Sequence, residues 1–373
     1  MGRRRIVAMV LAGALVGVAL APGPALAGQG ESADPRRDAQ YALTSLRLPA
    51  AWTRTQGTGV VIAVVDTGID QRHPDLVDHL LPGTDLVDGD DDPDDPNGHG
   101  THVAGLAAAV GGNGEGITGA APEAELLPVR VLRTDGSGSA RTIADGVDWA
   151  VAHGARVVNL SLGGGGLAPA LFANGPLNRS VRNAAARGVV VVAAAGNEAV
   201  TETAYRPGVP VVVVNATDAG GGPAPFSTFG DPSAVAAPGV DVLSTTPLAP
   251  TTRWPTGTDG YEVMDGTSMS AGLVSGVAAL LLAQGLNADE VREVLVTTAR
   301  NPDAEPRLGA GVVDADAAVT EGARRHPAAR TVPAKTPDGR FAPWMAPLSV
   351  VAAAVLLPAA GLALVRRRAR TPG

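Results

Sequence analysis

The chain contains no cysteine among its 373 residues, which excludes disulfide bonds, thiol chemistry and cysteine-based metal sites. Aromatic residues are scarce, at 3 %, although hydrophobic residues make up 45 %, so the core has to be built from Ala, Val and Leu. No basic patch with interleaved aromatic residues occurs, and the formal net charge is −8, which argues against a nucleic-acid partner. The chain is rich instead in glycine (48) and proline (30), so many tight turns are expected. Packing or bound ions must supply the stability that disulfides would give.

Residues 1–27 are expected to be a secretory signal peptide. They have an arginine-rich start, a short apolar stretch and a small-x-small cleavage site at residues 25–27. An uncleaved membrane anchor is the alternative, which the short apolar stretch and the prolines after it disfavour. Residues 28–40 would then be a short N-terminal extension.

Residues 344–365 form a second apolar stretch, without charge, whose length fits a membrane-spanning helix. The arginine-rich residues 366–373 would form a cytoplasmic tail. A buried core helix is the alternative. Residues 321–343, rich in proline and arginine, are expected to be an extended linker. We therefore expect a single-pass protein of the cell membrane, with its body outside the cytoplasm and its C-terminus inside.

Between these ends, apolar runs rich in β-branched residues alternate with helical stretches. The expected strands are residues 60–65, 126–132, 157–161, 189–194 and 211–214. The expected helices are residues 101–110, 142–153, 181–187 and 268–283. Continuous apolar strands separated by helices indicate a parallel sheet covered on both faces, which is a three-layer α/β domain.

A carboxylate is expected at the end of the first strand, in the segment Asp66-Thr67-Gly68-Ile69-Asp70. Functional groups gather beyond the carboxyl ends of the strands in a parallel sheet, and Gly68 allows a sharp turn after Asp66. Asp70 is a rival carboxylate further into the loop. On its own, an Asp after a strand would more simply cap a turn.

An imidazole comes next, from His99 or His102 at the start of an expected helix of small residues. Histidines three residues apart could bind a metal, but no nearby Glu completes a zincin pattern. A hydroxyl follows at Ser268, where the last of these helices begins. There it would face backbone N–H groups and the positive end of the helix dipole, although a serine at a helix start is usually an N-cap. Asn197, after a strand, has an amide that could donate to an oxyanion or simply occupy a turn.

Together these segments resemble the active-site segments of subtilisin-like serine proteases. The chain order Asp…His…Ser is the subtilisin order. Residues 119–122, 237–239 and 266–269 also match the family's sequence. The resemblance implies a peptidase domain over residues 41–320, with a subtilisin-like three-layer α/β fold and a mostly parallel sheet. It also implies an endopeptidase that works through an acyl-enzyme and needs no cofactor for its chemistry.

The resemblance assigns a role to each site residue. The implied catalytic residues are Asp66, His99 and Ser268, with Asn197 as the oxyanion donor. The implied substrate-binding residues are Ser161, Leu162 and Gly163, which would pair with the substrate backbone. The base of the specificity pocket would fall near residues 204–205. Gly272 departs from the family, which usually has proline there, so the rate could be reduced.

A structural calcium ion is a further expectation from the resemblance, at a site to which Gln40, Asp75 and Asn113 correspond. A second candidate is the acidic loop of residues 88–95. It is not an EF-hand, because the position that needs glycine is Pro93. A solvated acidic loop without metal is the alternative.

The short extension, the C-terminal apolar segment and the proline-rich linker together resemble mycosins, the membrane-anchored subtilisin-like proteases of type VII secretion systems. Mycosins often have cysteines in their loops, and this chain has none. The expected partners are a protein or peptide substrate, the membrane and subunits of a type VII secretion channel. Two other functions stay open: a scaffolding subunit of a secretion complex, and a general degradative surface protease.

Overall fold

The computed structural model describes residues 34–162, 175–201 and 208–327. In this part of the chain an eight-stranded sheet has the order β10-β7-β6-β5-β4-β1-β3-β2, and its neighbouring strands pair in parallel. Its strands are β1 (Val61–Asp66), β2 (Thr84–Asp85), β3 (Glu125–Arg130), β4 (Val157–Leu160), β5 (Val190–Ala194), β6 (Val211–Thr217), β7 (Val235–Pro238) and β10 (Gly311–Val312). Strands β8 (Val242–Thr245) and β9 (Tyr261–Met264) form a separate antiparallel pair.

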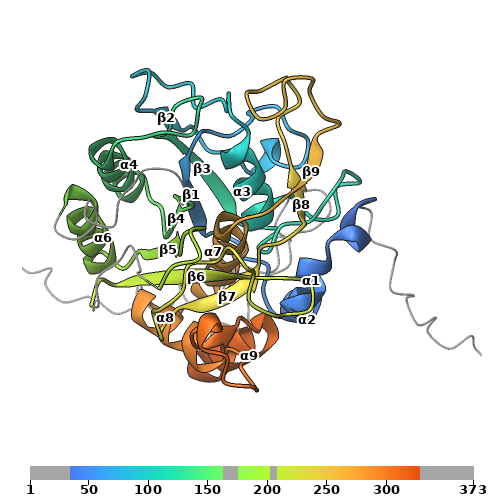
Figure 1. Ribbon diagram of the computed structural model, residues 1–373, viewed down its shortest axis with the longest axis vertical. Coiled ribbons are helices and arrows are strands. Elements are labelled where there is room, and N and C mark those ends of the chain that lie inside the picture. The colour runs from blue at the N-terminus through green and yellow to red at the C-terminus, as the bar shows by residue number, and fades with distance from the viewer. Residues whose placement is uncertain (1–33, 163–174, 202–207, 328–373) are drawn as a thin grey trace, which may run out of the picture.

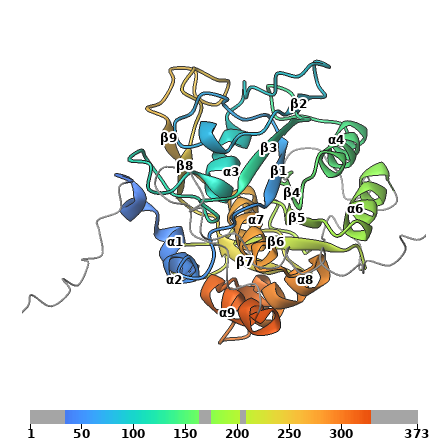
Figure 2. The same ribbon diagram turned by 180° about the vertical axis from the view of Figure 1, so that it is seen from behind.

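Helices cover both faces of the sheet, as Figures 1 and 2 show from opposite sides. Helices α4 (Ala140–Ala152) and α6 (Pro176–Ala186) lie together on one face, and α3 (His99–Ala108) and α7 (Thr267–Ala283) lie on the other. The remaining helices are α1 (Tyr41–Ser45), α2 (Leu48–Ala51), α8 (Ala288–Thr297) and α9 (Ala315–Arg325), with short 3₁₀ turns at Arg37–Ala39, Val77–His79 and Pro306–Leu308. The three-layer α/β fold expected from the sequence is therefore confirmed.

Each face of the sheet has its own aliphatic core. Side chains of β1 alternate between the two, because Ile62 and Val64 belong to the core under α3 and α7, and Ala63 and Val65 to the core under α4 and α6. Helix α7 is buried along almost its whole length, with apolar or small side chains on every side. The central helix of the molecule is thus the one whose first turn holds the expected nucleophile, Ser268.

All nine expected strands and helices are present, with shifted ends. The largest shift is in α6, which begins at Pro176, five residues before the expected start at 181, because proline fits the first turn of a helix. The sequence analysis did not predict β2, β7, β10 or the β8–β9 pair. These strands have two to four residues each, too few for a hydrophobic period to be visible.

The sequence analysis placed the start of the linker, expected over residues 321–343, too early. Helix α9 continues through residue 325, because Asp314 caps its start and Glu321 pairs with Arg324 and Arg325 in its last turn. Arg325 also pairs with Glu293 of α8, which ties this end to the body. The linker can therefore begin only after α9.

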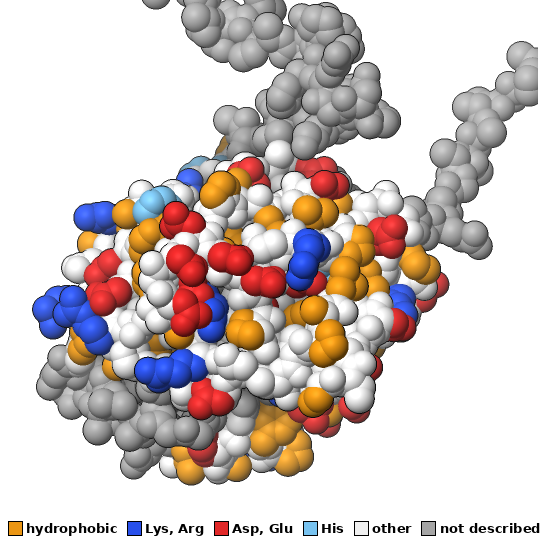
Figure 3. Space-filling model, turned by 90° about the horizontal axis from the view of Figure 1, so that it is seen from above, with side chains coloured by type: hydrophobic (Ala, Val, Ile, Leu, Met, Phe, Trp, Pro, Cys, Tyr) orange, Lys and Arg blue, Asp and Glu red, His pale blue; other side chains and the backbone are white. Residues whose placement is uncertain are grey.

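The signal peptide, the rest of the linker and the apolar segment 344–365 lie outside the described residues. Among the residues that are described, no helix has both the length and the apolar character needed to cross a bilayer. Seen from above, acidic side chains gather near the middle of the visible face, in keeping with the negative net charge (Figure 3). Residues 34–40 pack onto the body, with Asp34 and Gln40 buried.

Candidate active site

Asp66 and His99 form the best-defined polar pair of the site. Asp66 is the last residue of β1, a strand paired on both sides, and its carboxylate is fully buried. His99 is the first residue of α3, and its Nδ1 lies 2.7 Å from Asp66 Oδ1. The same oxygen accepts the N–H of Thr67. The buried carboxylate thus fixes the plane of the ring, while 15 % of the His99 side chain stays exposed.

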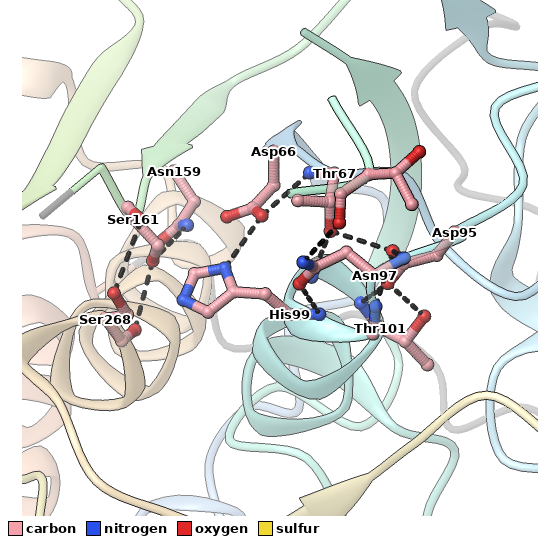
Figure 4. Close-up of polar contacts among 12 residues, drawn as sticks. Asp66, Thr67, Asp95, Asn97, His99, Thr101, Asn159, Ser161 and Ser268 are labelled. Atoms are coloured by element: carbon pink, nitrogen blue, oxygen red, sulfur yellow. Dashed lines mark hydrogen bonds and ion pairs between the residues drawn. The ribbon is translucent and has the colours of Figure 1, made fainter. Parts of the chain in front are cut away.

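Ser268 lies on the opposite side of the His99 ring from Asp66, in the first turn of α7 (Figure 4). Its hydroxyl donates to the backbone oxygen of Ser161, at 3.3 Å, rather than to the imidazole. Rotation about the Cα–Cβ bond can redirect this hydroxyl, because a serine has three staggered positions. The three groups predicted from separate segments are therefore brought together, with the hydroxyl in a resting orientation.

A buried hydrogen-bond chain supports the start of α7. The Asn159 amide donates to Ser161 Oγ at 2.8 Å, and Ser161 Oγ donates to the backbone oxygen of Ser268 at 3.0 Å. Ser275, two turns along α7, donates to Asn159 Oδ1 at 2.9 Å. These hydrogen bonds therefore fix the position of the end of β4 relative to α7, the helix that carries Ser268.

Asn197 lies beside the same helix start. Its Oδ1 accepts both the N–H and the hydroxyl of Thr267, each at 3.0 Å. With the amide oxygen held in this way, the amide N–H₂ group points away from Thr267. The N–H of Ser268, in the first turn of α7, has no acceptor within the helix, so this N–H and the Asn197 amide are available to an anionic oxygen.

The two rival residues point elsewhere. The Asp70 carboxylate accepts the N–H of Leu248 at 2.9 Å and of Arg72 at 2.9 Å. His102 is fully buried, its Nε2 lies 3.1 Å from the backbone oxygen of Glu262, and burial lowers its pKa to about 3. A ring that stays neutral and enclosed has the character of a core histidine.

The expected substrate-binding segment begins directly after β4. Ser161 and Leu162 are both buried, and the Leu162 side chain belongs to the core under α4 and α6. Gly163 and the expected specificity pocket near residues 204–205 lie outside the described residues. The described residues therefore show where this segment leaves the sheet, which is next to Ser268.

Two glycines let α3 approach its neighbours. A Cβ on Gly100 would lie 2.1 Å from the backbone oxygen of Gly68. A Cβ on Gly272 would lie 3.0 Å from the backbone oxygen of Val103, so this departure from the family permits close contact between α3 and α7. Helix α7 continues past Gly272 without a break.

The three residues expected to bind calcium lie around one loop, but their oxygen atoms are engaged. Asp75 accepts the Asn113 amide at 3.0 Å and the N–H of Ile117 at 2.8 Å. Gln40 exchanges two hydrogen bonds with the backbone of Thr118. Calcium takes six to eight oxygen ligands, whereas the side-chain oxygens named here already accept hydrogen bonds from the protein. Within the described residues no three His, Asp or Glu side chains form a metal cluster, so calcium stays a prediction.

The acidic loop of residues 88–95 meets a cation of the protein itself. Arg130, at the end of β3, pairs with the buried Asp85 and with Asp88 at 2.7 Å. Hydrogen bonds to these carboxylates raise the pKa of Arg130, against the opposing effect of burial. Arg130 therefore neutralises the start of this loop.

Asp95, the last residue of the acidic loop, is a site residue that the sequence analysis did not single out. It is only 4 % exposed and turns inward beneath the start of α3 (Figure 4). The available signal was its position, four residues before His99 and at the end of an otherwise exposed acidic run.

Comparison with known proteins identifies the family. The subtilase family profile matches residues 57–319, more than half of the chain. The chain is 42 % identical to thermitase of Thermoactinomyces vulgaris over 261 residues, covering 70 % of this chain and 88 % of thermitase. It is 39 % identical to subtilisin Savinase of Lederbergia lenta over 282 residues, covering 74 % and 97 %. A protease structure from Pseudoalteromonas arctica matches with a TM-score of 0.69 and 36 % identity, covering 78 % of this chain and 99 % of that one. The chain therefore belongs to the subtilase family of serine endopeptidases, which need no cofactor for catalysis.

Proposed function

We propose that this chain cleaves peptide bonds with Ser268 as nucleophile, His99 as general base and Asp66 as the group that orients His99. The observation that carries the proposal is the 2.7 Å contact between Asp66 and His99 Nδ1, with Ser268 on the far side of the ring. The contact places a proton on Nδ1, because a buried carboxylate accepts hydrogen bonds and does not donate them. Nε2 is then the free base.

The steps follow from these positions. Ser268 Oγ attacks the peptide carbonyl carbon while His99 Nε2 takes its proton. The Asn197 amide and N–H groups at the start of α7 stabilise the carbonyl oxygen as it becomes anionic. His99 then gives its proton to the leaving amine, and an acyl-enzyme remains. Water attacks the acyl-enzyme by the same steps, with His99 again as base, and the acid product is released.

Substrate binding is assigned to the segment after β4. We propose that the backbone of Ser161, Leu162 and Gly163 pairs with an extended substrate strand. The support is the position of Ser161, whose carbonyl contacts Ser268 Oγ in the free enzyme. A bound substrate would draw Ser268 Oγ away from that carbonyl and toward the scissile bond.

Labelling with a fluorophosphonate probe tests the proposed chemistry. The folded full-length chain should take up one probe per molecule, and mass mapping should place the adduct on Ser268. A folded chain that is not labelled, or that is labelled elsewhere, would overturn the assignment.

We further propose a membrane tether and a role beside a type VII secretion channel. The support is the apolar segment 344–365, the arginines that follow it and the proline-rich stretch before it. The full chain should stay in the membrane fraction through alkaline washing, while a chain ending at residue 343 should be released. Channel subunits should copurify with the detergent-extracted full chain. Copurification that Ser268→Ala leaves unchanged would add a scaffolding role, and full release by alkaline washing would contradict the tether.

Gly100→Ala should damage the site without removing a catalytic group. The added methyl would lie 2.1 Å from the Gly68 oxygen and 3.2 Å from Asp66 Cβ, so α3 must shift away from β1. We expect a stability loss of about 1–3 kcal/mol. We expect kcat/KM to fall by about 100-fold, because a displacement near 1 Å can have that effect.

Gly220→Ala is the matched control, since Gly220 is exposed and a Cβ there would meet only Asp218 Oδ1, at 3.3 Å. Denaturant unfolding and peptide hydrolysis measure the two effects. Wild-type kcat/KM in Gly100→Ala would show that the close approach of α3 to β1 is not needed.

A further inference from the structure

We propose that Asp95 is a positioning residue, whose buried carboxylate holds the end of β1 and the start of α3 at the separation that the Asp66–His99 pair needs. The inference rests on the proposed function of that pair. In this inference the Asp95 carboxylate touches neither the substrate nor the reacting atoms. It acts through its contacts with the residues next to Asp66 and His99.

The Asp95 carboxylate accepts five hydrogen bonds, which Figure 4 draws together. Oδ1 accepts Thr67 Oγ1 at 2.8 Å, the N–H of Asn97 at 3.1 Å and the N–H of Gly98 at 2.8 Å. Oδ2 accepts both the N–H of Thr101, at 2.9 Å, and its hydroxyl, at 2.7 Å. Partners from the end of β1, from the loop and from α3 therefore meet on one side chain.

Asp66 and His99 are each adjacent in sequence to a residue of this network. Thr67 follows Asp66, and Gly98 and Gly100 flank His99. Thr67 Oγ1, while donating to Asp95, accepts the N–H of Gly100 at 2.9 Å. The network thus closes a ring of hydrogen bonds across the gap that the Asp66–His99 contact spans.

The charge of Asp95 is part of the arrangement. All five partners donate, which suits an ionised carboxylate, and no Arg or Lys pairs with Asp95 among the described residues. Burial raises the pKa of this carboxyl, and the hydrogen bonds from Gly98, Thr101 and Thr67 oppose that effect. A negative charge at the first turn of α3 also interacts favourably with the positive end of the helix dipole. Gly98, the N-cap residue of α3, has no side chain that could cap the helix.

Two other carboxylates belong to the same region. Asp66 contacts His99 directly, and Asp70 donates its backbone N–H to Thr101 Oγ1 but turns its carboxylate to Leu248 and Arg72. Neither of these carboxylates accepts any of the five donors that Asp95 holds.

Asp95→Asn in the full-length chain is the test. Its amide would turn N–H₂ toward either Thr67 and two backbone donors or the Thr101 pair, so the ring of hydrogen bonds opens. We expect kcat to fall by about 10- to 100-fold with KM within about twofold, because positioning is lost and binding is not.

Asp314→Asn is the control, a buried aspartate outside the site that caps α9 through the N–H of Ala317, at 3.0 Å, and also pairs with Arg47 and Arg300. It should lower stability and leave kcat and KM in place. Thr67→Val supplies a second variant should Asp95→Asn not fold. It keeps the charge but breaks the ring of hydrogen bonds, so kcat should fall about tenfold with KM within about twofold.

Three outcomes are decisive. Lower kcat at nearly constant KM in both variants, with kcat unchanged in Asp314→Asn, would support the inference. Wild-type kcat in Asp95→Asn or, where that variant does not fold, in Thr67→Val would overturn it and leave Asp95 as a structural cap. A folded wild-type chain that neither hydrolyses peptide nor reacts with the fluorophosphonate would overturn the proposed function, and this inference with it.

Discussion

Ser268→Ala will lower peptide hydrolysis by roughly a million-fold and abolish labelling by a fluorophosphonate. The size of the loss is the one that removal of the nucleophilic serine has in subtilisin, a relative of this chain. The physical reason is that Ser268 Oγ is the proposed attacking oxygen, and without it His99 has no nucleophile to deprotonate. Ser268 lies beside the His99 ring (Figure 4). Initial rates on a chromogenic peptide, over a long time course, measure the loss.

The fold should survive this substitution. Ser268 Oγ makes one long hydrogen bond, of 3.3 Å, and losing it costs about 1 kcal/mol or less. Ser270→Ala is the matched control, on the same helix and with two carbonyl partners, at 2.9 Å and 3.1 Å. It should lose more stability than Ser268→Ala and far less activity. Equal losses of activity in the two variants would contradict the assignment of the nucleophile.

Asp66→Ala should lower kcat by roughly 30,000-fold, the size of loss that removal of the triad aspartate has in subtilisin. In the proposed mechanism Asp66 holds the Nδ1 proton of His99 and supplies the negative charge that stabilises the ring once it is protonated. Without it, the ring can turn, and its protonated form loses a buried partner. Initial rates on a chromogenic peptide measure the loss, which should appear at every pH.

Asp70→Ala distinguishes the two carboxylates of this loop. Asp70 is as buried as Asp66 but accepts backbone N–H groups of Leu248 and Arg72 rather than the imidazole. Its loss should lower the free energy of unfolding by about 1–3 kcal/mol through two unsatisfied donors, with kcat reduced far less than in Asp66→Ala. A deeper loss of kcat in Asp70→Ala would reverse the two roles.

Much of the fold could be predicted because its strands are uniform. Runs such as residues 189–194 are apolar throughout, as strands buried on both faces must be, and helices follow them at regular intervals. The β8–β9 pair was not predictable in the same way. Its strands have only four residues each, and β8 is mostly buried while β9 is mostly exposed. The pair is held by side-chain contacts to α3, including Thr245 Oγ1 to the backbone oxygen of Thr101 at 2.7 Å.

The candidate site was readable in its residue types and less so in its hydrogen bonds. Asp66, His99 and Ser268 stand in segments whose neighbours match a known family, so the sequence could name them. The inward turn of Asp95 depends on the path of the loop around it, and the pairing of Arg130 with Asp85 depends on the order of β2 and β3 in the sheet. No local pattern encodes such contacts between distant segments.

The enclosure of α7 bears on how this enzyme will lose its activity. A protease in solution is also a substrate for its own copies, and cleavage needs a segment that can open and extend. Helix α7 is covered by the sheet, α3, α8 and α9, so its amide hydrogens should exchange only when the whole domain opens. Autolysis should therefore begin in segments other than α7, and α7 itself should open only when the whole domain unfolds.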